Sequence, residues 1–99
     1  MILETATLCI KPGKQLEFEA AMQEAKTIIA SMKGFISLAV RPCFEQDSQY
    51  LLEVRWETLE DHTVGFRGSP EYQHWKALLH HFYDPFPTVK HYGEPRIEA

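Results

Sequence analysis

The stretch that decides the fold is FISLAVRPCFEQDSQYLLEVRWE, residues 35–57. Residues 35–44 and 50–57 are rich in aliphatic, β-branched and aromatic side chains, and the polar run EQDS at 45–48 separates them. Two such runs joined by a short polar loop predict an antiparallel β-hairpin. Pro42 lies late in the first run and indicates an edge strand or a bulge there, because proline has no N–H to donate to a ladder.

The segment before this hairpin predicts a strand and then a helix. Residues 2–11, ILETATLCIK, have the composition of a strand, and Pro12-Gly13 ends it. Over residues 14–33 apolar side chains recur every three or four positions, which predicts an amphipathic helix with Gly34 as its C-terminal cap. The apolar stripe of this helix consists of Phe18, Met22, Ala25, Ile29 and Met32.

The segment after the hairpin predicts a second helical region and a last strand. Thr58, with Asp61 three positions later, matches a capping box, and Ser69-Pro70 is typical of a second helix start. Residues 86–92, FPTVKHY, read as the fourth strand. The buried stripe of the second helix is expected to be Tyr72, Trp75, Leu79 and Phe82.

The element order is therefore β-α-β-β-α-β. This order predicts an α+β, ferredoxin-like fold, in which both helices cover one face of a four-stranded antiparallel sheet. A chain of 99 residues has room for one domain. We expect that domain to span residues 1–93, with a frayed C-terminal tail over 94–99.

Apolar side chains occur on both faces of this predicted sheet. In the strand at 50–57, for example, Leu51 lies on the face opposite to that of Leu52 and Val54. The helices cover one face only, so the second face needs another cover, and a second copy of the chain is the economical one. We therefore expect a homodimer, with a monomer that exposes a few aliphatic side chains as the alternative. Two charged pairs are interpreted as interface ion pairs, namely Glu53 with Arg55 and Glu4 with Arg41.

Composition and charge exclude several classes of protein. The net charge is -4 and the ten Lys and Arg residues are scattered, so no nucleic-acid partner is expected. No apolar run approaches the ~18 residues of a membrane span, and the N-terminus lacks the features of a signal peptide. The two cysteines, Cys9 and Cys43, are interpreted as reduced, buried thiols of a cytoplasmic protein.

The run YLLEVRWE at 50–57, followed by FRGSPEY at 66–72, resembles the antibiotic biosynthesis monooxygenase family. Lys11-Pro12-Gly13 after the first strand, Phe18 in the helix and Gly34-Phe35 extend the resemblance over about residues 1–93. The resemblance implies a dimeric α/β barrel with a cavity between the helices and the sheet. It also implies, for active members, the use of molecular oxygen without flavin or metal to oxidise quinols and anthrones.

Heme-degrading relatives in this family carry an Asn in the first strand, a Trp three residues before a Ser, and a heme-ligating His. The chain has Thr5, Phe66 and Lys76 at the corresponding positions. All three heme-associated side chains are therefore replaced, so heme degradation is not expected and we expect no cofactor.

Oxygenation without a cofactor requires a base that generates an electron-rich anion from the substrate. Histidine is the side chain best suited to proton transfer near neutral pH, and His62, one turn before Phe66, is the predicted catalytic base. The alternative for His62 is a solvated or capping histidine. The predicted substrate-binding residues are Thr5, Trp56, Phe66, Tyr83 and His81.

The other histidines predict no metal site. His74 and His81 are seven positions apart, hence about 10.5 Å along one side of a helix, too far to share a metal easily. His80 is expected to point elsewhere, and the strand face of His91 stays open. The function expected is a cofactor-independent monooxygenase acting on a small, hydrophobic aromatic or quinol-type substrate. A non-catalytic small-molecule-binding or stress-response dimer is the alternative.

Overall fold

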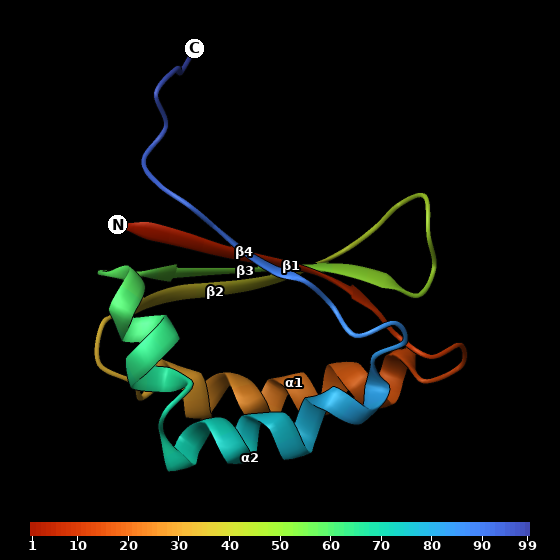
Figure 1. Ribbon diagram of the computed structural model, residues 1–99. Coiled ribbons are helices and arrows are strands. Elements are labelled where there is room, and N and C mark those ends of the chain that lie inside the picture. The colour runs from red at the N-terminus through yellow and green to blue at the C-terminus, as the bar shows by residue number, and fades with distance from the viewer.

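The computed structural model describes residues 1–99. Its elements, in chain order, are β1 (Ile2–Cys9), α1 (Gln15–Ala30), β2 (Phe35–Pro42), β3 (Gln49–Trp56), the π-helix η1 (Asp61–Phe66), α2 (Pro70–Leu79), the 3₁₀ turn η2 (His80–Phe82) and β4 (Val89–Tyr92). The strands form one antiparallel sheet in the order β2-β3-β1-β4. Both α-helices lie under one face of this sheet (Figure 1). The predicted α+β, ferredoxin-like fold is confirmed. None of the helices is long and apolar enough to cross a membrane.

The core lies between α1, α2 and the covered face of the sheet. The predicted stripe of α1 supplies Phe18, Met22, Ala25 and Ile29, all buried. The helix ends at Ala30, however, so Gly34 does not cap it and instead leads into β2 with φ of 83°. The predicted caps of the second helical region are confirmed, because Thr58 Oγ1 accepts from Asp61 N and Ser69 Oγ from Tyr72 N, both at 3.1 Å.

The side chains of β2 do not alternate strictly between the covered and the uncovered face of the sheet. A register irregularity between Phe35 and Ser37 interrupts the alternation of this strand, as bulges do. Phe35 therefore packs against the core together with Leu38 and Val40, while Ile36 is 46% exposed. Strict alternation along residues 35–44 would place Ile36 on one face with Leu38 and Val40, but the alternation does not continue through the irregularity.

The opposite face of the sheet carries no helix (Figure 1). Arg41 on β2 pairs there with Glu53 on β3, so the predicted pairing of Glu4 with Arg41 was wrong. Glu4 is buried on the helix side instead, because it shares the parity of Ala6 and Leu8 along β1. The predicted interface role of Glu4 is therefore replaced by a role inside the core.

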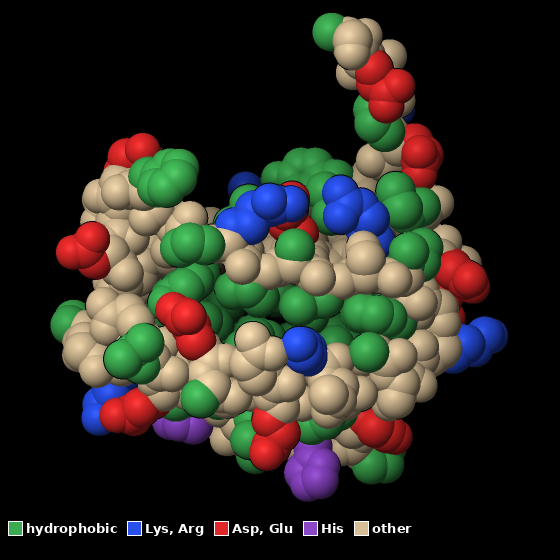
Figure 2. All heavy atoms as spheres, turned by 180° about the vertical axis from the view of Figure 1, so that it is seen from behind, with side chains coloured by type: hydrophobic (Ala, Val, Ile, Leu, Met, Phe, Trp, Pro, Cys, Tyr) green, Lys and Arg blue, Asp and Glu red, His purple; other side chains and the backbone are tan.

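A second open region lies along the edge between β2 and α1. Figure 2 shows hydrophobic side chains gathered in a hollow between the sheet layer and the helix layer on this side of the molecule. Phe18, Met22, Val40 and Tyr50 line part of it, and the hydroxyl of Tyr50 donates to Glu19 at 2.6 Å. The strand order places β2 at an edge of the sheet, as the position of Pro42 predicted.

The start of β2 lies close to η1 because position 34 has no side chain. A Cβ atom built on Gly34 would clash with the carboxyl group of Asp61, and the positive φ of Gly34 is itself unfavourable for other residues. Asp61 is the first residue of η1, which also carries His62.

Gly34→Ala is expected to lower the free energy of unfolding by about 1–3 kcal/mol or more, because both the strained φ and the contact with Asp61 oppose a methyl group. For a domain of this size each 1 kcal/mol corresponds to roughly 4–8 °C in Tm, measurable by thermal unfolding. Gly13→Ala is the matched control, because Gly13 has φ of 82° but nothing within 4 Å. Equal losses in the two variants would contradict the close approach to Asp61.

Candidate functional site

A cavity of about 290 Å³ lies between the β1 side of the sheet and the helices. Leu8, Leu52 and Val89 contribute its apolar sheet wall. Five aromatic side chains also line it, namely Phe66, Tyr72, Trp75, Tyr83 and Phe86. The polar or titratable side chains of other types are Glu4, His62, Arg67 and His80. The cavity is therefore aromatic with a few acid–base groups, the usual composition of a small-molecule site.

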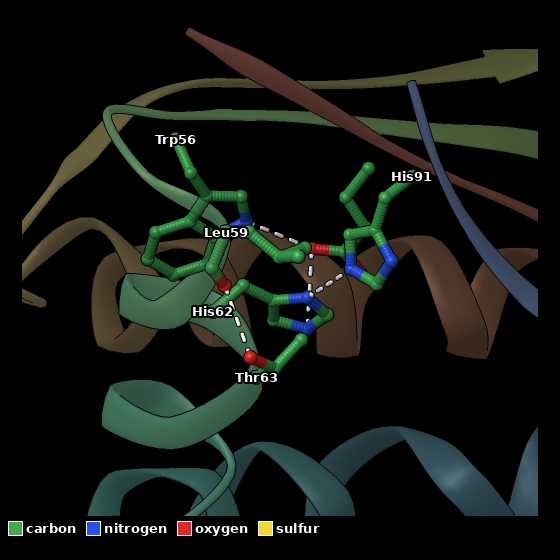
Figure 3. A network of polar contacts seen from close by, with 6 residues as sticks. Trp56, Leu59, His62, Thr63 and His91 are labelled. Carbon is green, nitrogen blue, oxygen red and sulfur yellow. Dashed lines mark hydrogen bonds and ion pairs between the residues drawn. The ribbon is translucent and has the colours of Figure 1, made fainter. Parts of the chain in front are cut away.

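A cluster of polar contacts includes two of the residues that line this cavity, Glu4 and His62 (Figure 3). Glu4 and His62 are 5% and 3% exposed. The Trp56 Nε1–H group donates to Glu4 Oε1 at 2.9 Å, and His62 Nε2 lies 3.4 Å from the same oxygen. On the other side of its ring, His62 Nδ1 lies 2.7 Å from Nε2 of His91. Four elements, β1, β3, η1 and β4, thus meet in one cluster held by two hydrogen bonds and the contact between Glu4 and His62.

The backbone brings these groups together by register and by one wide helical turn. Glu4 is the Cα partner of Val54 on β3 and of His91 on β4, so it lies in the middle of the sheet. In η1 the Arg67 N–H donates to the carbonyl of His62, five residues back, at 3.1 Å. Such π-turns are frequent at functional sites. The His62 ring stacks on Trp56 with 5.4 Å between centroids.

Burial sets the protonation of the cluster. Burial raises the pKa of the Glu4 carboxyl, although the hydrogen bond from Trp56 and the charge of Arg67 oppose this shift. Burial, with the positive charge of Arg67 and the neighbouring His91, lowers the pKa of His62 to about 3. Burial and Arg67 also lower the pKa of His91. The site therefore favours the uncharged forms of all three groups.

Three of the residues predicted for the site line this cavity: His62, Phe66 and Tyr83. Trp56 lies behind His62, fully buried, and supports the cluster from the core. The structure places Thr5 and His81 outside the cavity, which corrects their predicted positions. Thr5 belongs to the opposite face of the sheet because it alternates with Glu4 and Ala6.

His81 is exposed, and its ring lies against Phe82 with 4.1 Å between centroids. His80 lines the cavity instead, so the expectation that it points elsewhere was wrong. The cause is the end of α2 at Leu79: residues 80–82 form a 3₁₀ turn, and the angular spacing of an α-helix does not extend past that point.

Sequence reasoning missed Glu4 and His91 as site residues. The sequence signal for Glu4 was its place on the same face of the strand as Ala6, Leu8 and Ile10. It is the single charged residue on that buried face. No sequence signal gave the face of His91, since β4 has only four residues. Its side is set by the pairing with Glu4.

The side chains that commonly bind metal ions are dispersed over the structure. No three His, Cys, Asp or Glu side chains lie close enough together to hold a metal ion. Cys9 and Cys43 are both unpaired, and both are half-buried instead of buried as expected.

The antiparallel ferredoxin-like sheet, with an aromatic cavity between it and the helices, defines the class of small α+β proteins to which the chain belongs. Within that class, the chain belongs to the antibiotic biosynthesis monooxygenase family, whose family model matches residues 1–78.

Known relatives agree with this assignment. The chain is 59% identical over 94 residues to the uncharacterized protein YczJ of Bacillus subtilis (strain 168), which covers 95% of this chain and 99% of YczJ. A crystal structure from Bordetella bronchiseptica, assigned to the antibiotic biosynthesis monooxygenases, is 31% identical with a TM-score of 0.91, covering 95% of this chain and 96% of that one. The structure of SnoaB, a cofactor-independent oxygenase from Streptomyces nogalater, has a TM-score of 0.76 and covers 97% of this chain and 94% of that one. At 14% identity, the likeness to SnoaB shows a shared fold.

Glu4→Gln is expected to change how stability depends on pH. A carboxyl whose pKa is raised in the folded state stabilises the fold below its ordinary pKa of 4.5 and loses that contribution as the pH rises through the folded value. The Tm of the variant relative to wild type therefore increases from pH 4 to pH 8. The corresponding difference in the free energy of unfolding changes by at most roughly 1.4 kcal/mol per pH unit.

The control for this titration is Glu98→Gln in the exposed C-terminal tail, which is expected to follow the wild-type profile. A constant difference in Tm between Glu4→Gln and wild type across this pH range would contradict the raised pKa of Glu4.

Proposed function

We propose that the protein is a cofactor-independent monooxygenase that oxidises a small aromatic or quinol-type substrate with molecular oxygen in this cavity. The observation that carries the proposal is the buried pair of Glu4 and His62, an acid–base group placed inside an otherwise aromatic cavity. Membership of the antibiotic biosynthesis monooxygenase family supports it, as does the shared fold with SnoaB, which is described as a cofactor-independent oxygenase.

The size and lining of the cavity favour a compact aromatic ligand. At about 290 Å³ it lies near the lower end of the ~300–1,000 Å³ of typical ligand sites. Phe66 and Trp75 offer ring faces for stacking, with 5.7 Å between their own centroids at a near-perpendicular angle. A ligand of one to three fused rings fits these dimensions better than a porphyrin or a long polyketide.

The acid–base pair supplies what oxygen chemistry without a cofactor needs. Loss of a proton from an activated CH₂ group, as in an anthrone, gives an anion that can transfer electrons to oxygen. The overall reaction, R₂CH₂ + O₂ → R₂C=O + H₂O, balances with no external reductant, because the substrate provides all four electrons. The pair of His62 and Glu4 accepts the proton, and the positive charge of Arg67 at the cavity stabilises the anion.

A non-catalytic small-molecule-binding or stress-response role for the same cavity is the second candidate. The observation that favours it is the set of replacements at Thr5, Phe66 and Lys76, where heme-degrading relatives have functional side chains. Thr5 and Lys76 do not line the cavity, so these replacements leave its acid–base pair intact.

Oxygen consumption with a panel of hydroquinones and anthrones separates the two candidates. We expect turnover by wild type and a loss of roughly 10²–10⁴-fold in kcat for His62→Ala, since general acid–base catalysis, to which the pair of Glu4 and His62 belongs, contributes that much. His74→Ala, at an exposed position of α2, is the control and is expected to retain the wild-type rate. Compounds that raise the melting temperature but are recovered unchanged would instead favour the binding role.

We also propose that the chain forms a homodimer through the uncovered face of the sheet. This face has a hollow lined by Leu3, Leu51 and Tyr92, among others, and Leu51 and Tyr92 are exposed. Exposed apolar side chains that adjoin a concave sheet surface mark an interaction site. A two-fold axis would bring two such faces together and supply the second cover of the sheet.

Leu51→Asp is expected to convert the dimer to a monomer, because it buries a charge in the proposed interface. Sedimentation equilibrium measures the change, from near twice 11.5 kDa for wild type to near 11.5 kDa for the variant. The control is Leu16→Asp on α1, where the leucine is 82% exposed and remote from the uncovered face. A wild-type mass near 11.5 kDa would exclude the dimer.

We also propose that the protein is cytoplasmic. Cys9 and Cys43 are unpaired, which fits a reducing compartment. Cys9 lines the hollow of the uncovered face, so the proposed dimer would also shield this thiol from oxidants.

A further inference from the structure

Both ring nitrogens of His62 are engaged by other side chains of the protein. Nε2 lies 3.4 Å from Glu4 Oε1, and Nδ1 lies 2.7 Å from His91 Nε2. A ligand in the cavity therefore finds no free nitrogen on this ring. Glu4 and His62 both line the cavity, but the ring nitrogens of His62 face protein groups, so the carboxyl of Glu4 is the member of the cluster that can exchange a proton with a ligand.

The cluster also leads from the core to the surface. Glu4 is on β1, in the interior of the sheet, whereas His91 is on β4, an edge strand. Glu4 and His62 are buried, and His91 is half-exposed. Figure 3 shows the rings of His62 and His91 side by side, with Trp56 on the far side of His62. The contacts thus run in the order Glu4, His62, His91, from two buried side chains to a half-exposed one.

We propose that Glu4, His62 and His91 form a proton relay between the ligand in the cavity and solvent. This inference rests on the proposed function, because it needs a ligand that gives up a proton. Glu4 is the residue that touches the ligand, His62 carries the proton between the two others, and His91 is the exit. The relay assigns the direct acceptor role to Glu4 and gives His62 the connecting role.

Each proton transfer in the relay keeps its members uncharged. One carboxyl oxygen of Glu4 takes the ligand's proton while the other, Oε1, gives its proton to His62 Nε2. His62 then gives the proton on Nδ1 to His91 Nε2, and His91 releases the proton on its own Nδ1 to water. One proton enters, one leaves, and both imidazoles change tautomer. The reverse sequence returns a proton to the cavity, where the reduced oxygen atom leaves as water.

The surroundings of the relay favour this neutral mechanism over one that passes through an imidazolium ion. Arg67, on the segment between η1 and α2, places a positive charge near all three members. The remaining titratable groups of the cavity are Tyr72 from α2, His80 from η2 and Tyr83 after it. None of these three belongs to the chain of polar contacts between Glu4 and His91.

Imidazole nitrogen chemical shifts, measured by NMR on wild type without any ligand, test the relay directly. The single proton between His62 Nδ1 and His91 Nε2 forces the two rings to have the same tautomer. We expect both rings to change together from Nδ1–H to Nε2–H as Glu4 loses its proton with rising pH. In Glu4→Gln the amide oxygen accepts from His62 Nε2–H at every pH, so both rings stay in the Nε2–H form.

The result that would overturn the relay is a wild-type spectrum in which the two rings titrate independently or hold different tautomers. This readout needs no turnover, so it distinguishes a failed relay from a failed monooxygenase proposal: correlated tautomers without oxygen consumption would retain the relay's geometry and reject the reaction.

The kinetics of the His91→Phe variant provide a second test, of the exit role of His91. We expect kcat to fall roughly tenfold in dilute buffer with KM unchanged, because His91 does not line the cavity. Added imidazole is expected to restore kcat by replacing the exit group, and it should not restore His62→Ala. His74→Phe is the control. An unchanged kcat for His91→Phe, or a loss that imidazole does not repair, would overturn the exit role.

Discussion

The hydrogen bond from the Trp56 indole to the buried carboxyl of Glu4, 2.9 Å long, is the contact on which the arrangement of the site depends. A carboxyl group in a protein core costs several kcal/mol unless it has partners. Glu4 finds them on two other elements, because β3 supplies Trp56 and η1 supplies His62, and His91 on β4 contacts His62 in turn. The close approach of η1 to Gly34 brings His62 within reach, and the stacking of His62 on Trp56 fixes the plane of its ring.

The same burial that makes the carboxyl costly makes it chemically useful. Removed from water, Glu4 and the two imidazoles favour their uncharged forms, so the proposed relay would move protons among them without creating an isolated buried ion. Arg67 contributes the one positive charge of the cavity, which favours an anionic ligand and disfavours charged histidines. An aromatic cavity with these properties suits a ligand that is neutral when it enters and ionises once bound, which is what oxygenation without a cofactor requires.

Most of the fold could be predicted from the sequence, since long periodic patterns report burial. The stripe of α1 and the alternation of β3 came out as expected because each extends over several turns or residues. The site was harder, because its geometry depends on local departures from regular structure. A bulge moved Phe35 to the core, and a 3₁₀ turn exchanged His80 for His81 at the cavity. Glu4 was assigned to an interface ion pair because its charge was given more weight than its place on the buried face of β1.

The central claim is that this cavity removes a proton from an aromatic ligand. The most direct measurement is the absorption spectrum of an anthrone mixed with the protein in the absence of oxygen, where binding and ionisation are seen before any oxidation. The account predicts the longer-wavelength band of the ionised anthrone with wild type, and binding without that band with Glu4→Gln. An anthrone that binds to wild type and stays in its neutral form at neutral pH would contradict it.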